Sequence, residues 1–272
     1  MFNDQFYHGT LRKYVTLFGT LFNNLYVNRS DSNNRINTIK VPLVYGPKEK
    51  ALARLTANPN LDNAVALNIP RMGFEITTLS YAPTRKLGTI IRNRNVKDSN
   101  PSKLYTNYVP VPYDISFSLY ITAKFQDDAS QILEQILPYF TPERTPTVNL
   151  IPEMNYVVDI PLTLINVTPQ DTYEGGFEER RSITWTLDFV MKAHFYGPVK
   201  ESGVITLIDI NFFDTSGYES VDAAVGLATP PDIINIQPGQ LANGAPTSDI
   251  SLTVPRDQIA ANSTYGYVIT RG

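Results

Sequence analysis

Few side chains in this sequence are of the kinds that carry acid–base, nucleophilic or metal chemistry. There are two histidines, His8 and His194, and no cysteine. Neither histidine stands in a cluster with ligand spacing, so a zinc site is not expected, and disulfides and thiolate ligands are excluded. His194 falls on the polar side of an alternating segment, where it is interpreted as an ordinary surface residue.

One pair of acidic residues could imitate the two carboxylates of a hydrolase. Asp127 and Asp128 are adjacent, but they stand at the start of a segment with helical periodicity. Acids at that position accept hydrogen bonds from the free N–H groups of the first turn and suit the positive end of the helix dipole. Helix capping is therefore the preferred interpretation, and a hydrolase ranks last because no third group supports it.

Two charged segments are candidates for contacts with other molecules. The stretch between Pro83 and Pro112 has a net charge of +5, which indicates a solvated loop, a patch that faces an acidic partner or, less favoured, a contact with passing DNA. A shorter run before a strand is either a salt-bridged turn or an ionic contact between subunits. The basic residues of the first segment are Arg85, Lys86, Arg92, Arg94, Lys97 and Lys103, and the second segment is Glu178, Glu179, Arg180 and Arg181.

The composition of the chain favours binding over catalysis. Its 272 residues carry a net charge of −3, which argues against a general nucleic-acid binder. The sequence has no phosphate-binding loop, no Gly-x-Ser-x-Gly turn and no spacing that supports a Ser/His/Asp triad. With 16 tyrosines, 13 phenylalanines and 20 prolines, it is typical of a β-rich domain or of broad contact surfaces. We expect neither enzymatic activity nor a cofactor.

These candidate residues must be positioned by a series of helices and strands. Apolar residues recur at helical spacing over 11–25, with Thr10 as the expected N-cap, and a short helix is expected over 48–56. Strands are expected over 35–45, 72–80 and 156–167, and a long hairpin or loop over 83–112.

The strongest signals are two long strands with one buried face each. Apolar and polar residues alternate over 113–125 and again over 183–195. A helix follows the first of these strands, beginning at Asp127 and ending near Tyr139 because of Pro138. Together these elements predict an α+β fold, a twisted antiparallel β-sheet flanked by α-helices.

The sequence changes character after Asp214. Residues 217–272 contain several proline and glycine clusters and few large apolar residues in periodic order. We therefore expect a core domain at 1–214 and an extended, irregular C-terminal arm at 215–272, which is flexible or orders against a partner. No apolar run approaches the roughly 20 residues of a membrane helix, and the N-terminal stretch lacks the order of a signal peptide, so no membrane partner is expected.

Several short blocks, taken in order, resemble one family of proteins. The most distinctive block, Glu134–Phe140, reads Glu-Gln-Ile-Leu-Pro-Tyr-Phe. Other matching blocks are Arg12-Lys13-Tyr14, Val41-Pro42, Lys48-Glu49, Asp127-Asp128, Arg180-Arg181 and Trp185. Over roughly residues 1–200 the sequence resembles the tail terminator, or tail sheath stabiliser and completion, proteins of contractile-tailed bacteriophages of the myovirus type.

This resemblance implies a structural virion protein that is assembled in the host cytoplasm and needs no catalytic group. It implies a ring, of six subunits, that caps the tail tube and sheath, stabilises the sheath and connects the tail to the neck. The implied partners are further copies of the chain, the sheath and tube proteins and a neck or head completion protein, with DNA only passing through the lumen. The candidate contact residues are Arg85, Lys86, Arg92, Arg94, Gln131, Glu134, Gln135, Glu178, Glu179, Arg180 and Arg181.

A binding module is the alternative from a different functional class. The many tyrosines and the loop-rich edges would suit a monomeric carbohydrate- or peptide-binding domain. That interpretation predicts a pocket lined by aromatic side chains in a protein that does not assemble.

Overall fold

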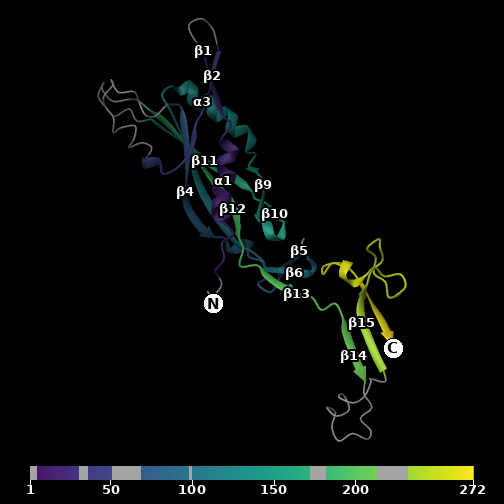
Figure 1. The fold of residues 1–272 in the computed structure, drawn as a ribbon. Helices are drawn as coiled ribbons and strands as arrows, with labels where there is room; N and C mark the ends of the chain where they lie inside the picture. The colour runs from purple at the N-terminus through teal and green to yellow at the C-terminus, as the bar shows by residue number, and fades with distance from the viewer. Residues whose placement is uncertain are drawn as a thin grey trace. The chain divides into compact units, whose positions relative to one another are not determined.

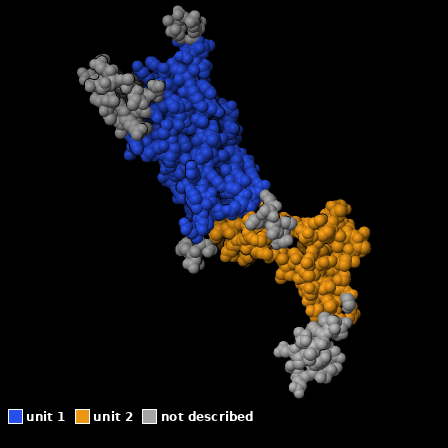
Figure 2. Space-filling model, viewed as in Figure 1, with its two compact units in different colours: residues 1–87, 110–196 blue, residues 88–109, 197–272 orange. Residues whose placement is uncertain are grey.

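The computed structural model describes residues 5–30, 36–50, 69–97, 100–171, 182–212 and 232–271. The chain forms two compact units (Figure 2): unit 1 comprises residues 1–87 and 110–196, and unit 2 comprises residues 88–109 and 197–272. The helix expected over 48–56 lies outside the described residues from residue 51 onward, as does the charged run from Glu178 to Arg181. The division into a core at 1–214 and an arm at 215–272 stays a prediction.

Unit 1 is built on a six-stranded sheet with the order β3-β4-β7-β12-β11-β8. The strands are β3 (Leu43–Tyr45), β4 (Arg71–Tyr81), β7 (Val111–Ala123), β8 (Glu143–Arg144), β11 (Leu162–Asp171) and β12 (Ile183–Phe195). β3 and β4 are parallel, and every other neighbouring pair is antiparallel. Two helices, α1 (Thr10–Phe22) and α3 (Gln126–Ile136), lie over one face of this sheet (Figure 1), which confirms the predicted α+β fold.

The two central strands, β7 and β12, correspond to the two long alternating segments. They pair along their whole lengths, from Val111 opposite Phe195 to Ala123 opposite Ile183. β12 has the predicted bounds, whereas β7 begins and ends two residues before the predicted 113–125. The strand ends early because Phe125 has left the sheet and serves as the N-cap of α3.

The core of unit 1 lies between α1 and the sheet. The ring of Phe18 stacks on Phe117 of β7 at a centroid distance of 4.4 Å and meets Phe189 of β12 edge-on at 5.4 Å. All three side chains are fully buried, and burial of each stabilises the fold by about 1.5–3 kcal/mol.

The N-cap of α1 is Gly9 rather than the predicted Thr10, because Gly9 adopts a left-handed conformation with φ 63°.

Two predicted strands are interrupted at prolines. Residues 35–45 form β2 (Ile36–Lys40) and β3 on either side of Pro42, and residues 156–167 form β10 (Tyr156–Asp159) and the start of β11 on either side of Pro161. Proline has no backbone N–H to donate to a ladder, so the chain changes partner at these points. β2 pairs with β1 (Tyr26–Ser30) in a two-stranded ribbon, and β10 pairs with β9 (Thr147–Ile151).

Unit 2 contains two three-stranded antiparallel sheets. β5 (Arg92–Lys97) and β6 (Asn100–Tyr108) form a hairpin within 83–112, where a hairpin or a loop was expected, and β13 (Lys200–Gly203) pairs with β6. The second sheet joins β14 (Ile208–Phe212), β15 (Asp232–Gly239) and β16 (Gly266–Arg271) in that order.

The region predicted as an irregular arm thus contributes two paired strands, β15 and β16. The strand signal in β15 is a short group of isoleucines, Ile233, Ile234 and Ile236, and the strand continues through Pro238 to Gly239. Among the described residues, no helix has the length and apolar character needed to span a membrane.

Candidate interaction surface

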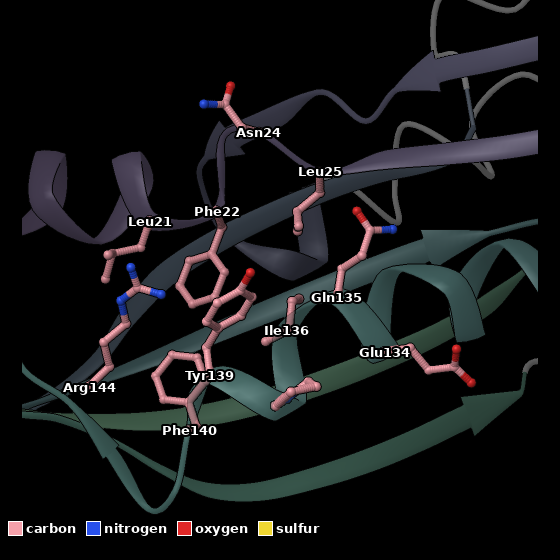
Figure 3. Close-up of a pocket in the computed structure, with 11 residues that line it drawn as sticks. Leu21, Phe22, Asn24, Leu25, Glu134, Gln135, Ile136, Tyr139, Phe140 and Arg144 are labelled. Carbon is pink, nitrogen blue, oxygen red and sulfur yellow. The ribbon is translucent and has the colours of Figure 1, made fainter.

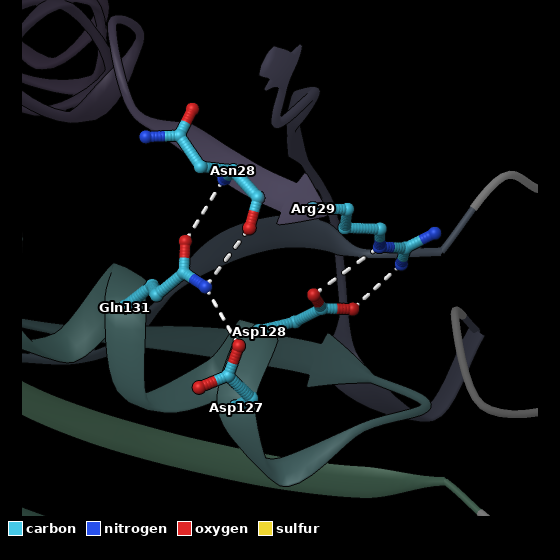
Figure 4. Close-up of polar contacts among 5 residues, drawn as sticks. All are labelled: Asn28, Arg29, Asp127, Asp128 and Gln131. Atoms are coloured by element: carbon cyan, nitrogen blue, oxygen red, sulfur yellow. Dashed lines mark hydrogen bonds and ion pairs between the residues drawn. The ribbon is translucent and has the colours of Figure 1, made fainter. Parts of the chain in front are cut away.

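Two glutamines of α3 bind the backbone of β1. The side-chain Oε1 of Gln131 accepts a hydrogen bond from the N–H of Asn28 at 2.9 Å, and its Nε2 donates to the C=O of Asn28 at 3.1 Å (Figure 4). Gln135 makes the same pair of bonds with Tyr26, at 3.3 and 2.7 Å. Four residues along a helix and two along a strand both span about 6 to 7 Å, so the two side chains match alternate backbone groups of β1.

An ion pair extends this contact along α3. The carboxylate of Asp128 accepts hydrogen bonds from Nε and Nη2 of Arg29 at 3.2 and 2.6 Å (Figure 4). The side chain of Asp128 is 3% exposed and that of Arg29 36%. The hydrogen bond to Asp128 raises the pKa of Arg29, and the guanidinium therefore remains charged beside its partner.

The predicted capping role of the two aspartates is wrong. α3 has no side-chain cap hydrogen bond, because Asp128 turns to Arg29 and the carboxylate of Asp127 accepts a hydrogen bond from Nε2 of Gln131 at 2.7 Å. Both acids still lie in the first turn, where they suit the helix dipole.

The three candidate contact residues of α3 therefore differ in their surroundings. Gln131 and Gln135 are half-buried and bind β1 within the same chain, whereas the side chain of Glu134 is exposed. A partner that bound Gln131 or Gln135 would have to replace their hydrogen bonds to β1, whereas Glu134 is exposed to a partner.

A cavity of about 550 Å³, open on one side, lies between the ends of α1 and α3 (Figure 3). Its apolar wall includes Phe22 and Ile136, which are buried, and Phe140. Arg144 also lines the cavity, with its guanidinium carbon 5.2 Å from the ring centroid of Tyr139. Glu134 also lines the cavity, but its carboxylate points away from the aromatic wall (Figure 3).

The sequence block that most strongly suggested a family is also the main wall of this cavity. Six residues of Glu134–Phe140 line it, and the remaining wall comes from the end of α1 and from Arg144. Periodicity alone could not have found the cavity, since residues 21–25 and 134–144 meet only in the folded chain.

The basic candidates are divided between the two units. In unit 1, Arg85 donates a hydrogen bond to the carboxylate of Asp114 at 2.6 Å, and Lys86 is exposed. In unit 2, the guanidinium of Arg92 lies 4.9 Å from the ring centroid of Tyr108, and Arg94 is exposed. The charged stretch 85–103 is therefore not one continuous patch within either unit.

His194 is not the ordinary surface residue that the alternation predicted. Its side chain is half-buried, and its backbone C=O and N–H bind the phenol oxygen of Tyr14 at 2.6 and 2.9 Å. Burial, assisted by the charge of Arg85, lowers the pKa of His194, so the neutral imidazole is favoured. In the described parts of the chain, no three His, Asp or Glu side chains gather in a way that could hold a metal ion.

Comparison with known proteins identifies the family. The family model of the tail sheath stabiliser of T4-like Myoviridae matches residues 5–247, which extends beyond the resemblance recognised over residues 1–200. The tail completion protein gp15 of Enterobacteria phage T4 is 32% identical over 248 residues, covering 84% of this chain and 88% of that protein. The chain therefore belongs to the tail sheath stabiliser family of contractile-tailed phages, and it is a structural protein of the virion tail.

Proposed function

We propose that the chain forms a ring of six subunits that caps the tail tube and the sheath. The observation that carries this proposal is the family match over residues 5–247, because its members stabilise the tail sheath. A ring built from one repeated interface presents the same surface to every subunit of the last sheath layer, which suits a protein that ends a polymer.

The ring has partners on two sides in this proposal. One side holds the terminal sheath and tube subunits, and the other connects the tail to a neck or head completion protein, with DNA passing only through the lumen. Holding the end of a sheath requires complementary surfaces and no covalent chemistry, so the proposed function includes no catalytic step and no cofactor.

The exposed charged residues are the proposed contacts of this ring. Glu134, Lys86 and Arg94 are exposed, so each can meet an oppositely charged partner at little cost. Arg85 and Arg92, which contact Asp114 and Tyr108 within the chain, are also proposed contacts of the ring. The run from Glu178 to Arg181 remains a proposed intersubunit contact on its sequence alone.

The experiment that tests this function measures assembly on a natural template. The purified chain, 30.5 kDa, is analysed by light scattering alone and by negative-stain electron microscopy after mixing with purified tail tubes and sheath. Six-fold rings, free or at one end of the tubes, are the expected result. A strict monomer that binds neither tube nor sheath would overturn the proposal and favour the binding-module alternative, in which the cavity beside Tyr139 takes a small ligand.

A further inference from the structure

We propose that one face of the sheet formed by β5, β6 and β13 binds the phosphate backbone of duplex DNA. This face is called the basic face and consists of Arg92, Arg94, Thr106, Tyr108 and Lys200. The inference rests on the proposed function, because a ring through which DNA passes brings the duplex to the chain. It adds a binding site in unit 2 and names the chemistry of its ligand.

The register of the sheet brings these five side chains to the same face. Arg94 lies opposite Thr106, and Thr106 lies opposite Lys200, so these residues form one row across the three strands. Arg92 lies opposite Tyr108, two positions along the same strands. Directly opposed residues of an antiparallel pair share a face, as do residues two positions apart in one strand. The three cations therefore meet only in the folded sheet.

The basic face is open to solvent, and the described residues place no acid on it. Arg92, Arg94, Tyr108 and Lys200 are exposed, whereas Asn107 on the opposite face is 3% exposed. The acid in the described part of these strands, Glu201, pairs with Lys103 on that opposite face.

The charge of this face differs from the charge of the chain. Within the described parts of the structure, the side chains of Arg94 and Lys200 make no ion pair. Three cations and no acid give the face a local charge of +3, although the whole chain has −3. A concentrated positive face is the electrostatic feature that phosphate binding requires.

The position of these charges favours a nucleic acid over a protein partner. Protein interfaces are depleted of charged residues at their centre. Here the central row carries Arg94 and Lys200, with Thr106 between them. Protein–DNA interfaces are more polar and much more positively charged. The folded sheet therefore favours DNA, which the sequence alone ranked below an acidic partner.

The aromatic residue of the basic face favours a duplex over a single strand. Single-strand sites present free aromatic rings on which successive bases stack. The guanidinium of Arg92 lies 4.9 Å from the ring centroid of Tyr108 and donates a hydrogen bond to its phenol oxygen at 3.0 Å, so one side of this ring is covered. A guanidinium has several N–H donors, and Arg92 keeps others for a phosphate.

The dimensions of the basic face match a short length of DNA backbone. Strand geometry separates its cations by about 7 Å along a strand and about 10 Å across the sheet. One DNA strand has a phosphate for about every 3.4 Å of helix axis, so about three phosphates can lie over this face. Such contacts are weak and independent of sequence, with Kd of roughly 10⁻⁴ to 10⁻⁶ M at physiological salt. Weak binding suits a duplex that has to move through the ring.

The salt dependence of DNA binding tests this inference. Binding of the purified chain to a fluorescent duplex is measured by anisotropy at several salt concentrations. For the wild type, the logarithm of the binding constant should fall with the logarithm of the salt concentration with a slope of about −2.7 per subunit, since each of three phosphates contributes about −0.9. Arg94→Ala and Lys200→Ala should each reduce this slope by about one third and weaken binding by about threefold to tenfold.

Two further variants separate the basic face from net charge and from folding. Lys103→Ala removes a cation from the opposite face of the same sheet and should leave both affinity and slope unchanged. Ser202→Arg adds a cation on the basic face, at an exposed position two residues from Lys200. It should tighten binding and steepen the slope by about one third, a gain that misfolding cannot produce.

The outcomes identify the ligand of this face. If the wild type does not bind duplex DNA, or if Arg94→Ala and Lys200→Ala bind it with wild-type affinity and slope, the inference is overturned while the proposed ring stands. If these variants keep DNA binding but lose binding to DNA-free tails, the face binds an acidic protein, which also overturns the inference. Ring formation on tail tubes is measured separately, so a chain that binds DNA through this face without forming rings would refute only the proposed function.

Discussion

The phenol of Tyr14 binds backbone groups that no strand reaches. β11 begins opposite Met191 of β12, so the backbone of His194 extends past the last residue of its neighbour on that side. The phenol O–H donates to the C=O of His194 and accepts from its N–H. Burial raises the pKa of Tyr14 to about 12 from 10.0, because the charged phenolate is poorly solvated there.

Tyr14→Phe should lower the free energy of unfolding by about 1–2 kcal/mol at pH 7, because it leaves both backbone groups without this partner. Because the pKa of Tyr14 is raised in the folded state, stability also depends on pH. The stability that the neutral phenol contributes is complete below pH 10 and is lost as the pH rises toward 12. Urea unfolding at pH 7 and between about pH 10 and 12 measures both effects. The variant should lose less stability across the alkaline range than the wild type.

Tyr7→Phe is the matched control for this prediction, since Tyr7 is 84% exposed. It should leave the stability at pH 7 unchanged. Equal alkaline losses in wild type and Tyr14→Phe would contradict the assignment of that loss to Tyr14.

At the scale of elements, α3 closes one edge of the β1–β2 ribbon. An edge strand presents unpaired N–H and C=O groups, which can pair with another chain unless the protein covers them. Gln131 and Gln135 satisfy these groups at Asn28 and Tyr26, and Arg29 secures the same strand through Asp128. The helix thereby holds the ribbon without extending the sheet.

Replacing both glutamines, Gln131→Ala/Gln135→Ala, should release β1 from α3. Because Tyr26 and Asn28 are exposed, water can replace the lost bonds, and the expected loss of stability is only about 1–2 kcal/mol. Hydrogen exchange should show faster exchange at the amides of Tyr26 and Asn28. Gln126→Ala, an exposed position on the same helix, should change neither quantity, and unchanged exchange in the double variant would refute the proposed role.

A close approach between β4 and β7 depends on a glycine. A Cβ atom added at Gly73 would lie 2.2 Å from the phenol oxygen of Tyr120, whose O–H donates a hydrogen bond to the C=O of Gly46 at 2.9 Å. Gly73→Ala should therefore displace a buried ring and cost about 1–3 kcal/mol in thermal or urea unfolding. Gly203→Ala, where a Cβ atom meets nothing within 4 Å, is the control and should cost clearly less.

At the scale of the whole molecule, the basic residues divide between two units that each have their own sheets. Arg94 lies in β5 of unit 2, with its side chain exposed. If unit 2 meets an acidic partner, Arg94→Ala should weaken binding of the ring to tails by about threefold to tenfold, and the difference should shrink at high salt.

Arg256→Ala removes another exposed arginine from a different part of unit 2 and serves as the control. Binding is measured by co-sedimentation with purified tails at two salt concentrations. Equal binding by wild type and both variants would remove Arg94 from the proposed contacts.

Local patterns in the sequence determined most of the elements of unit 1. The alternation that predicted β12, the helical spacing of α1 and the acids at the start of α3 depend on near neighbours in the chain. Residues 83–112 were expected to form a hairpin or a loop, and the structure shows that they contain the hairpin of β5 and β6. The resemblance to tail sheath stabilisers also came from residues read in order, and the family match confirmed it.

Only the tertiary structure decided which partners those residues meet. Asp128 was expected to cap its helix, but Arg29, 99 residues away, is placed beside it by the packing of β1 on α3. The same packing turned Gln131 and Gln135 inward, left Glu134 exposed and created a cavity from two distant segments. Periodicity shows which face of an element is buried, whereas the neighbour on that face depends on sheet register and helix docking across the whole chain.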